Sequence, residues 1–384
     1  MVVTVSHSGY VKRVPLSTYR AQRRGGKGRA GVQMRDEDFV TKMFVANTHT
    51  PILFFSSEGM VYRMKVWRLP IGTPQSRGKA LINILPLKAG ERITSVMPLP
   101  QDPDERAKLN ILFATKSGGV RRNLLTDFLS VNRAGKIAMK LEDDSDAIVD
   151  VQLCAPEDDV LLTTALGQCI RFSVEDVRVF TGRTSTGVRG IRLGAGDALI
   201  AMSVLGQIDV TPAESRAYLK RANAARRAEG EDGVEEVEDD TASDGDDASL
   251  SAEANGEVEL SDDRFAQLGK AEQFILTLTE EGMGKRASAF DYRRTGRGGK
   301  GLIAHRLPKE GRLVASFPIG ESDEIMVVTD AGQLIRCAVD QIRIAGRATQ
   351  GVRVLRVAAG ERVVSVERLE DQSGDETAGE TGGG

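Results

Sequence analysis

The 384-residue sequence has few aromatic residues, few cysteines and no long hydrophobic run. Its apolar stretches, such as PILFF at 51–55, have the length of a β-strand and fall far short of the ~20 residues that a membrane-spanning helix needs. The start, MVVTVSHSGYVKR, lacks the basic beginning and the apolar core of a signal peptide. We therefore expect neither a membrane span nor a secretion signal.

Other scarce residues exclude further classes of site. The three cysteines have no CxxC spacing, which argues against a disulfide framework or a zinc site and favours free thiols in a reducing compartment. The three histidines show no metal-ligand spacing, so no metal is expected. Aromatic residues make up 5% of the chain and do not interleave with its basic segments, which disfavours stacking of single-stranded bases.

The net charge of −3 hides an uneven distribution of charge. Between Glu229 and Asp263 there are 16 acidic residues and no Lys or Arg. The rest of the chain has 52 basic against 39 acidic residues, a balance of +13. A basic body suits a polyanionic partner, whereas a block of like charge is usually a solvated, disordered segment.

Six segments share the pattern of a β-hairpin: a short apolar run, Ser or Thr, a glycine-bearing turn and a second short run. They are VVTVSHSGYVKR (2–13), ILFFSSEGMVYR (52–63), ILFATKSGGVRR (111–122), VLLTTALGQCIR (160–171), FILTLTEEGMGKR (274–286) and IMVVTDAGQLIR (325–336). Their turn glycines, Gly9, Gly59, Gly118, Gly167, Gly282 and Gly332, are 50, 59, 49, 115 and 50 residues apart. The long intervals contain the polar loop 101–108 and the acidic segment, so the period is close to 50 residues.

Two basic features recur with this period. The residue four after each turn glycine is an arginine: Arg13, Arg63, Arg122, Arg171, Arg286 and Arg336. A basic loop then follows each hairpin: QRRGGKG (22–28), TPQSRGKA (73–80), SVNRAGKI (130–137), GRTSTG (182–187), TGRGGKG (295–301) and GRATQG (346–351). Because equivalent positions of a cyclic repeat share one rim, these cations predict a basic belt.

The chemistry of the loops suits an anion. Glycine lets backbone N–H groups approach an anion closely, and Arg and Lys form charge-assisted bonds to phosphate. A P-loop needs a strand that feeds directly into a helix, whereas β-like patterns flank these loops, so a nucleotide pocket is not expected. The remaining residues also alternate as strands do. About four strands per repeat, six times over, predict an all-β, propeller-like fold.

The heptapeptide Gln22–Gly28 resembles the signature box of the C-terminal domain of gyrase A, the A polypeptide of a bacterial type IIA topoisomerase, DNA gyrase. The resemblance covers about residues 1–207 and 270–371 and includes the box in the first of six repeats. It implies a six-bladed β-pinwheel in which neighbouring blades exchange strands. It also implies that double-stranded DNA wraps around the basic perimeter, with the box helping to fix the wrap. The related topoisomerase IV protein typically lacks an intact box, so the intact heptapeptide favours gyrase.

Site residues follow from this resemblance and from the repeats. The box consists of Gln22, Arg23, Arg24, Gly25, Gly26, Lys27 and Gly28. The predicted DNA-binding rim consists of Arg13, Arg63, Arg77, Lys79, Arg122, Arg133, Lys136, Arg171, Arg183, Arg286, Arg297, Lys300, Arg336 and Arg347. The loops 182–187 and 346–351 lack the Gly-Gly pair and the Lys of the box, so their grip on DNA is expected to be weaker.

The family further implies a part in a larger enzyme. Its cleavage tyrosine lies in a separate breakage-reunion region and its ATPase on the gyrase B subunit, so this chain is expected to hold no catalytic residue, metal or cofactor. ATP and Mg would bind elsewhere in a heterotetrameric holoenzyme of the bacterial cytoplasm. The alternatives are a topoisomerase IV-type domain and a propeller whose basic rim binds acidic proteins.

The expected domain organisation has four parts. Blades 1–4 occupy 1–207 and blades 5–6 occupy 270–371, with an insert at 208–269 and an acidic, glycine-rich tail at 372–384. Thr211, Pro212 and Glu214 form a capping-box start with proline at the first helical position, which predicts a basic helix over about 212–228. The acidic segment 229–263 is too polar to bury a core and is expected to be disordered.

Overall fold

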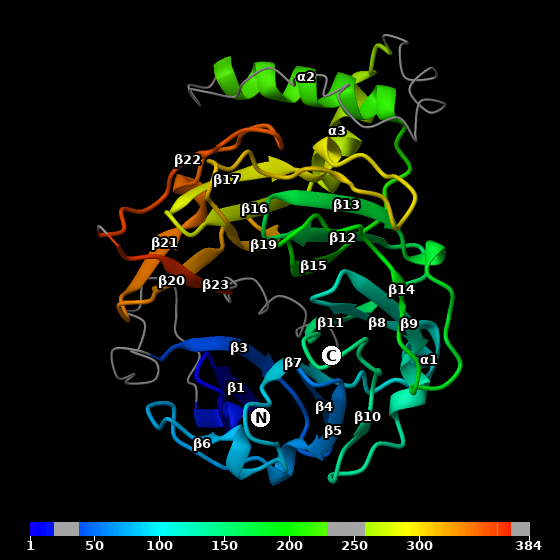
Figure 1. The fold of residues 1–384 in the computed structure, drawn as a ribbon, viewed down its shortest axis with the longest axis vertical. Helices are drawn as coiled ribbons and strands as arrows, with labels where there is room; N and C mark the ends of the chain where they lie inside the picture. The colour runs from blue at the N-terminus through cyan, green and yellow to red at the C-terminus, as the bar shows by residue number, and fades with distance from the viewer. Residues whose placement is uncertain (19–37, 229–257, 359, 370–384) are drawn as a thin grey trace, which may run out of the picture. The chain divides into compact units, whose positions relative to one another are not determined.

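The computed structural model describes residues 1–18, 38–228, 258–358 and 360–369. The predicted box at 22–28, most of the acidic segment and the C-terminal tail lie outside these residues. The described strands form six antiparallel sheets, and most of these strands are labelled in Figure 1. The chain divides into a first unit, residues 1–208 and 294–303, and a second unit, residues 209–293 and 304–384.

Four sheets make up the first unit, each with its central hairpin in the middle. In spatial order they are β3(Val40–Val45)-β1(Val2–Ser6)-β2(Tyr10–Val14)-β6(Lys79–Ala80), β7(Ile93–Pro98)-β4(Pro51–Ser56)-β5(Met60–Lys65)-β10(Lys136–Ile137), β11(Ile148–Cys154)-β8(Asn110–Thr115)-β9(Gly119–Leu124)-β14(Val188–Arg189) and β15(Leu199–Leu205)-β12(Asp159–Thr164)-β13(Gln168–Ser173)-β18(Leu302–Ile303). A short helix, α1(Pro103–Lys108), lies in the polar loop between the second and third repeats.

The second unit has two sheets and two helices. Its sheets are β19(Leu313–Ile319)-β16(Phe274–Thr279)-β17(Met283–Ser288)-β22(Val352–Arg353) and β23(Val363–Leu369)-β20(Glu324–Thr329)-β21(Leu334–Ala338). Its helices are α2(Pro212–Ala228) and α3(Asp262–Ala271). Short 3-10 helices follow the second hairpin strands of both units: η1(Leu16–Thr18), η2(Val66–Arg68), η4(Leu125–Phe128), η5(Val174–Asp176), η6(Ala289–Asp291) and η7(Val339–Gln341). One more, η3(Leu81–Asn83), follows the edge strand β6.

In each of five sheets, one edge strand comes from the following repeat. The strand β6 belongs by sequence to the second repeat, yet it pairs with β2 in the sheet of the first. The strands β10, β14, β18 and β22 do the same one repeat further along. The described residues form six repeated hairpins, exchange edge strands between repeats and include few helices. These features confirm the predicted all-β, six-bladed pinwheel. The exchange of strands also explains why residues 294–303 belong to the first unit, since β18 completes the sheet of β13.

All six turn glycines have the left-handed backbone conformation that the predicted hairpins need. Their φ angles are 75° at Gly9, 77° at Gly59, 85° at Gly118, 81° at Gly167, 77° at Gly282 and 80° at Gly332. Only glycine adopts this conformation without a steric penalty, so the turn positions could be found from the sequence.

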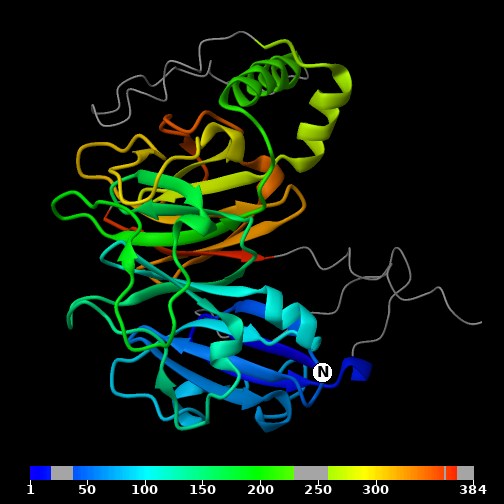
Figure 2. The same ribbon diagram turned by 90° about the vertical axis from the view of Figure 1, so that its right-hand side faces the viewer.

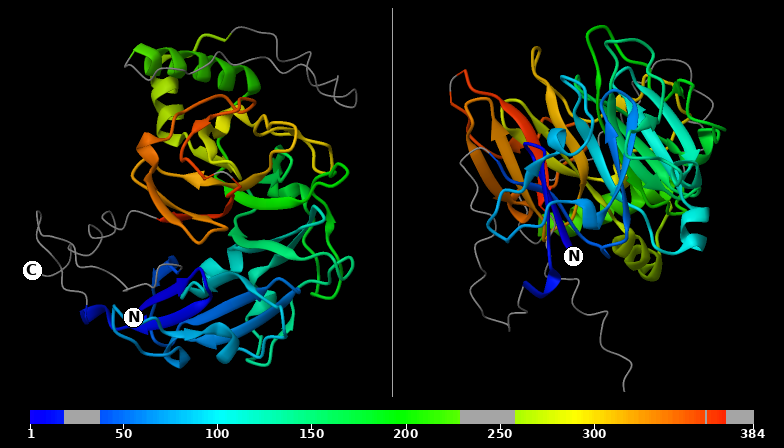
Figure 3. Two further views of the ribbon diagram at one scale, coloured as in Figure 1. Left: turned by 60° about the vertical axis from the view of Figure 1, so that its left-hand side comes forward. Right: turned by 90° about the horizontal axis from the view of Figure 1, so that it is seen from below.

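In the first unit, cores lie between neighbouring sheets that pack face to face (Figure 3). In β4, Ile52 and Phe54 pack against the first sheet, whereas Leu53 and Phe55 pack against the third. Phe55 meets Phe113 edge-on, with ring centroids 5.6 Å apart. A strand buried on both faces reads as a continuous apolar run, which is why PILFF lacks the alternation of a half-exposed strand.

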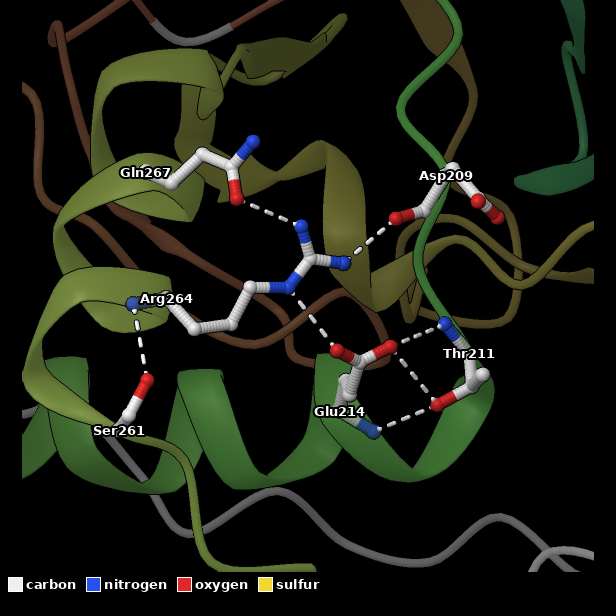
Figure 4. Close-up of polar contacts among 6 residues, drawn as sticks. All are labelled: Asp209, Thr211, Glu214, Ser261, Arg264 and Gln267. Carbon is white, nitrogen blue, oxygen red and sulfur yellow. Dashed lines mark hydrogen bonds and ion pairs between the residues drawn. The ribbon is translucent and has the colours of Figure 1, made fainter.

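The helix α2 begins where its capping box predicts. The Thr211 N–H donates to Glu214 Oε2 at 2.9 Å, and the Glu214 N–H donates to Thr211 Oγ1 at 3.2 Å (Figure 4). Arg264 of α3 joins this cap, since its Nε donates to Glu214 Oε1 at 2.9 Å and its Nη2 to the Asp209 carbonyl at 2.6 Å. The two helices, which cross at a steep angle in Figure 2, are therefore tied together at the N-terminus of α2.

The acidic segment ends earlier than expected. The sequence predicts disorder as far as residue 263, whereas α3 begins at Asp262 because Ser261 Oγ accepts a hydrogen bond from the Arg264 N–H at 3.2 Å. The carboxylates of Asp262 and Asp263 lie in the first turn of that helix, where they complement its dipole. Residues 229–257 lie outside the described residues.

The cysteines carry free thiols, as expected. Cys154 and Cys169 are buried, and burial raises the pKa of the Cys154 thiol to about 12. No helix in the described part of the chain is long and apolar enough to cross a bilayer.

Candidate nucleic-acid interface

The predicted basic loops lie where one repeat contributes a strand to the sheet of the preceding repeat. Five of the six, at 73–80, 130–137, 182–187, 295–301 and 346–351, lie in the described residues. Each connects a 3-10 helix of its own repeat to the exchanged edge strand. Each loop is therefore held by its own repeat at one end and by the sheet of the preceding repeat at the other.

Four of these loops end in a glycine that touches the neighbouring hairpin. A Cβ atom would lie 2.4 Å from the Val11 carbonyl oxygen at Gly78, and 2.1 Å from the Cys169 carbonyl oxygen at Gly301. Gly187 and Gly351 meet equivalent carbonyls at 2.1 Å and 2.6 Å. Such distances exclude any side chain, so this glycine is required by the approach of the loop to the strand. Gly301 is the counterpart, in the fifth repeat, of the last glycine of the box.

A set of exposed cations recurs five residues after the loop glycine, and the sequence reasoning missed it. The set follows Gly135, Gly187, Gly301 and Gly351, and it consists of Lys140, Arg192, Arg306 and Arg356. All four residues are exposed. The signal is present in the sequence as a constant offset from the loop glycine. It is found only once that glycine, instead of the turn glycine, is taken as the reference.

The main chain of this position is bonded to the loop of the next repeat. The Lys140 N–H donates to the Ser185 carbonyl at 3.3 Å, and the Arg192 N–H donates to the Gly299 carbonyl at 2.8 Å. In the second unit, the Arg306 N–H donates to the Thr349 carbonyl at 3.1 Å. The main chain of these three residues is thus fixed beside a basic loop. We call Lys140, Arg192, Arg306 and Arg356 the repeat-edge cations.

The arginines four residues after the turn glycines contact the next repeat. Arg13 Nε donates to the Leu69 carbonyl at 2.9 Å, and Arg286 Nε donates to the Ile342 carbonyl at 2.6 Å. In the third repeat the Arg122 guanidinium donates to the equivalent Val177 carbonyl at 3.3 Å, and also to the Val174 carbonyl at 3.0 Å. These side chains hold the chain of the following repeat as it leaves its 3-10 helix.

The remaining arginines of this set differ in their contacts. Arg171 forms an ion pair with Asp159 at 2.9 Å, and Arg336 forms an exposed ion pair with Glu324. Two of the six predicted rim arginines are buried: Arg122 is 8% exposed and Arg286 is 4% exposed. Both guanidinium groups are enclosed by protein carbonyls and cannot reach a phosphate in this structure.

The other predicted rim residues divide by exposure. Those that are exposed are Arg77, Lys79, Arg133, Arg297 and Lys300, together with Arg336. Those that are half-buried are Arg13, Arg63, Lys136, Arg171 and Arg183. Arg347 is buried, and its Nε donates to the Asp291 carbonyl at 3.1 Å. The residues of the box, Gln22–Gly28, lie outside the described residues.

A family model described as the DNA gyrase C-terminal domain, beta-propeller, matches the chain in six segments. These are residues 1–47, 50–100, 109–155, 158–205, 273–319 and 323–370, each with one of the six hairpins. The chain belongs to this family. The gyrase-type repeats of the family model thus coincide with the repeats that the sequence predicts, and the helices α2 and α3 fall in the interval between the fourth and fifth matches.

The similar curated proteins are gyrase A polypeptides from several bacteria. The protein of Granulibacter bethesdensis is 48% identical over 370 residues, which are 95% of this chain and 39% of that protein. The protein of Rickettsia bellii is 46% identical over 376 residues, 98% of this chain and 40% of that protein. That of Escherichia coli is 36% identical over 377 residues, 98% of this chain and 35% of that protein. The chain spans about two fifths of the length of these relatives.

Solved structures share the fold of this gyrase-family chain at low sequence identity. The C-terminal domain of DNA topoisomerase IV aligns with a TM-score of 0.70 at 22% identity, over 96% of this chain and 93% of that one. A DNA gyrase A C-terminal domain aligns with a TM-score of 0.60 at 21% identity, over 96% of this chain and 99% of that one. Both likenesses show the fold alone. The assignment to the gyrase family therefore rests on the sequence relatives and the family model.

Proposed function

We propose that this chain binds double-stranded DNA without sequence preference and wraps it, with a defined hand, around a basic perimeter formed by its repeats. The observation that carries the proposal is the recurrence of the repeat-edge cations in four repeats, three of them fixed beside the next basic loop. Cations that recur from repeat to repeat suit the repeating phosphates of a nucleic-acid backbone. Such cations offer few groups that read base edges.

Wrapping needs many weak contacts instead of one strong site. DNA is stiff over ~150 base pairs, so bending it tightly around a small domain costs on the order of 10 kcal/mol. Each neutralised phosphate releases condensed counterions, and roughly a dozen such contacts would give a salt slope near −10. Cations in every repeat would spread the favourable free energy of counterion release along the whole length of wrapped DNA.

Within the holoenzyme, the wrapped segment would reach the strand-passage machinery with one sign of crossing. We propose that the chain thereby directs ATP-dependent negative supercoiling. Its partners would be the breakage-reunion region of the same polypeptide and the gyrase B subunit, in a heterotetramer of the bacterial cytoplasm. The chain itself contributes no cleavage tyrosine and no ATPase site to this proposal. The ATP and Mg of the reaction belong to other regions.

The competing binding modes have less support. A propeller that docks acidic proteins would be expected to gather its cations at one mouth, whereas here they recur from repeat to repeat. A topoisomerase IV-type domain shares the fold, but the relatives at 36% to 48% identity described above are gyrase A polypeptides.

The deciding experiment measures DNA topology. Relaxed closed-circular DNA is mixed with the purified chain, a topoisomerase I is added, the protein is removed and the DNA is run on a gel. Supercoils of one sign that grow with protein and fade with salt support chiral wrapping. Binding without any change in linking number contradicts it. Replacing Gln22–Gly28 by alanines is expected to abolish the supercoils while the unfolding transition stays unchanged; persistence of the supercoils would remove the box from the proposal.

A further inference from the structure

Three cations in the first, third and fifth repeats are buried beneath the basic loops of the following repeats. Lys12, Arg121 and Lys285 stand three residues after their turn glycines and are 1%, 0% and 0% exposed. The same position is apolar or aromatic in the second and fourth repeats, where it is Tyr62 and Ile170. The buried cation therefore occurs in alternate repeats.

Each buried cation is coordinated by carbonyl oxygens of the loop above it. Lys12 Nζ donates to the carbonyls of Thr73, Pro74 and Ser76 at 3.1, 2.6 and 2.7 Å. Lys285 Nζ donates to those of Gly346, Arg347 and Thr349, the first at 2.8 Å and the last at 2.7 Å. Arg121 donates to those of Gly182 and Ser185. An ammonium has three N–H donors, so Lys12 and Lys285 are each satisfied by one loop.

The coordinated carbonyls occupy equivalent positions of the three loops. When each loop is counted backwards from its final glycine, Thr73 corresponds to Gly182 and Gly346, and Ser76 to Ser185 and Thr349. The loops at 73–78, 182–187 and 346–351 thus fold around an internal cation in the same way. The loops at 130–137 and 295–301 have no such cation and carry their own Lys136 and Lys300.

Peptide geometry then fixes the direction of the N–H groups. In a trans peptide the C=O of one residue and the N–H of the next point in opposite directions, and the described chain has no cis peptide bond. Carbonyls that converge inward on the buried cation therefore turn the following N–H groups outward. The N–H groups concerned are those of Gln75 and Arg77, of Arg183 and Thr186, and of Ala348 and Gln350.

These six N–H groups have no hydrogen-bond partner among the described residues. Gln75, Arg77, Thr186 and Gln350 are exposed, and the other two residues are half-buried. One further N–H of this kind already holds an anion: the Arg347 N–H, which follows the Gly346 carbonyl, donates to the Asp291 carboxylate. An outward N–H of such a loop is thus competent to bind an oxyanion.

We propose that Lys12, Arg121 and Lys285 are positioning residues that shape three phosphate-binding nests from the loops above them. Each nest presents two backbone N–H groups to a phosphodiester oxygen of duplex DNA, with a fixed positive charge one peptide plane below. The inference rests on the proposed function and deepens it. It also explains why GRTSTG and GRATQG need neither a Gly-Gly pair nor a Lys, since the cation is supplied from beneath.

The first test compares Lys285→Met with Lys285→Arg in binding of a mixed-sequence duplex. Arg121 performs the same role in its own nest, so Lys285→Arg is expected to keep the affinity, while Lys285→Met lowers it about tenfold, the value of one hydrogen bond to a charged group. Lys285 does not touch the phosphate, so the salt slope should stay the same. A surface cation in direct contact would instead change the slope by about one. Equal affinity of both variants would overturn the proposal.

A backbone test applies even if Lys285→Met fails to fold. The amide of Thr186 is replaced by an ester, which removes a single N–H and leaves every side chain in place. The affinity for the duplex is expected to fall several-fold, and the amide proton resonances of Arg77 and Gln350 in the unmodified chain are expected to move downfield when duplex is added. Unchanged affinity of the ester variant would overturn the proposal. Downfield shifts that appear with inorganic phosphate but not with duplex would show that DNA is not the ligand of the nests. If the unmodified chain does not bind duplex, the proposed function itself fails.

Discussion

Arg286 of the fifth repeat donates from Nε to the carbonyl oxygen of Ile342 in the sixth, at 2.6 Å. The guanidinium also reaches the Asp340 carbonyl, and the residue is 4% exposed. An arginine that sequence reasoning placed on a DNA-binding rim therefore connects two successive repeats. Arginines at this repeat position are therefore of two kinds, buried residues that connect repeats and exposed residues. Substitutions can distinguish the two kinds.

Replacing Arg286 by Met is expected to lower the free energy of unfolding by about 2 kcal/mol, because it removes the donor to the carbonyl of the buried Ile342. Arg336→Met, at the equivalent position of the sixth repeat, removes only an exposed ion pair with Glu324 and should cost less than about 1 kcal/mol. Urea denaturation measures both. Equal losses would show that Arg286 does not stabilise the junction between repeats.

The repeat-edge cations should govern the salt dependence of DNA binding. Lys140→Gln, Arg192→Gln and Arg356→Gln together are expected to make the salt slope less steep by about three, one for each phosphate that is no longer neutralised. Lys108→Gln, which alters an exposed cation at the end of α1, is the matched control and should leave the slope unchanged. A triple variant with an unchanged slope would remove these side chains from the DNA path.

The stability of the second unit should fall with acidification through His305. This side chain is 2% exposed and its Nδ1 lies 2.9 Å from Thr277 Oγ1, while burial, together with the charge of Lys285, lowers its pKa to about 3. In the unfolded chain the imidazole takes up a proton near pH 6.5. The native state is therefore progressively destabilised as pH falls from about 6.5 towards 3, by up to about 1.4 kcal/mol per pH unit.

His305→Met, which places at this position the residue found at the equivalent Met139, should flatten that dependence. The measurement is the free energy of unfolding between pH 6.5 and pH 4, compared with the unsubstituted chain so that contributions from carboxylates cancel. Parallel curves for the two proteins would mean that His305 is not the group responsible.

The junction of α2 and α3 should open locally when Arg264 is removed. Arg264→Met eliminates the bonds to Glu214 and to the Asp209 carbonyl that Figure 4 shows, and it is expected to weaken hydrogen-exchange protection at the start of α2 by about 1 kcal/mol. Arg216→Met, which changes another arginine of α2 itself, is the control. Protection in β16 and β17 should not change, since the sheet has its own core. Weaker protection throughout the second unit would contradict a local role.

The same ion pair predicts a pH effect. Hydrogen bonds from Thr211, with the Arg264 contact next, hold the pKa of the Glu214 carboxyl below its usual value. Its stabilising contribution is therefore complete above the unfolded value and is lost as pH falls through the lower folded value. Exchange protection at the start of α2 should decline in that range, and the decline should be reduced in the Arg264→Met variant.

The repeats and their local conformation could be predicted from the residues alone. The turn glycines, the hairpins, the capping box at Thr211 and the position of the basic loops all depend on neighbouring residues, so they could be recognised from spacing and residue type. The resemblance of the box to the gyrase family was equally a property of a short local stretch.

The role of each cation, in contrast, depends on the folded chain. Arg122 and Arg336 have the same offset from their turn glycines, yet one lies buried against carbonyls of the next repeat and the other lies exposed. Lys12 is enclosed by a loop more than 60 positions away in the sequence. Burial and hydrogen bonding of such groups depend on strands exchanged between repeats, and the spacing of residues within one repeat carries no record of those contacts.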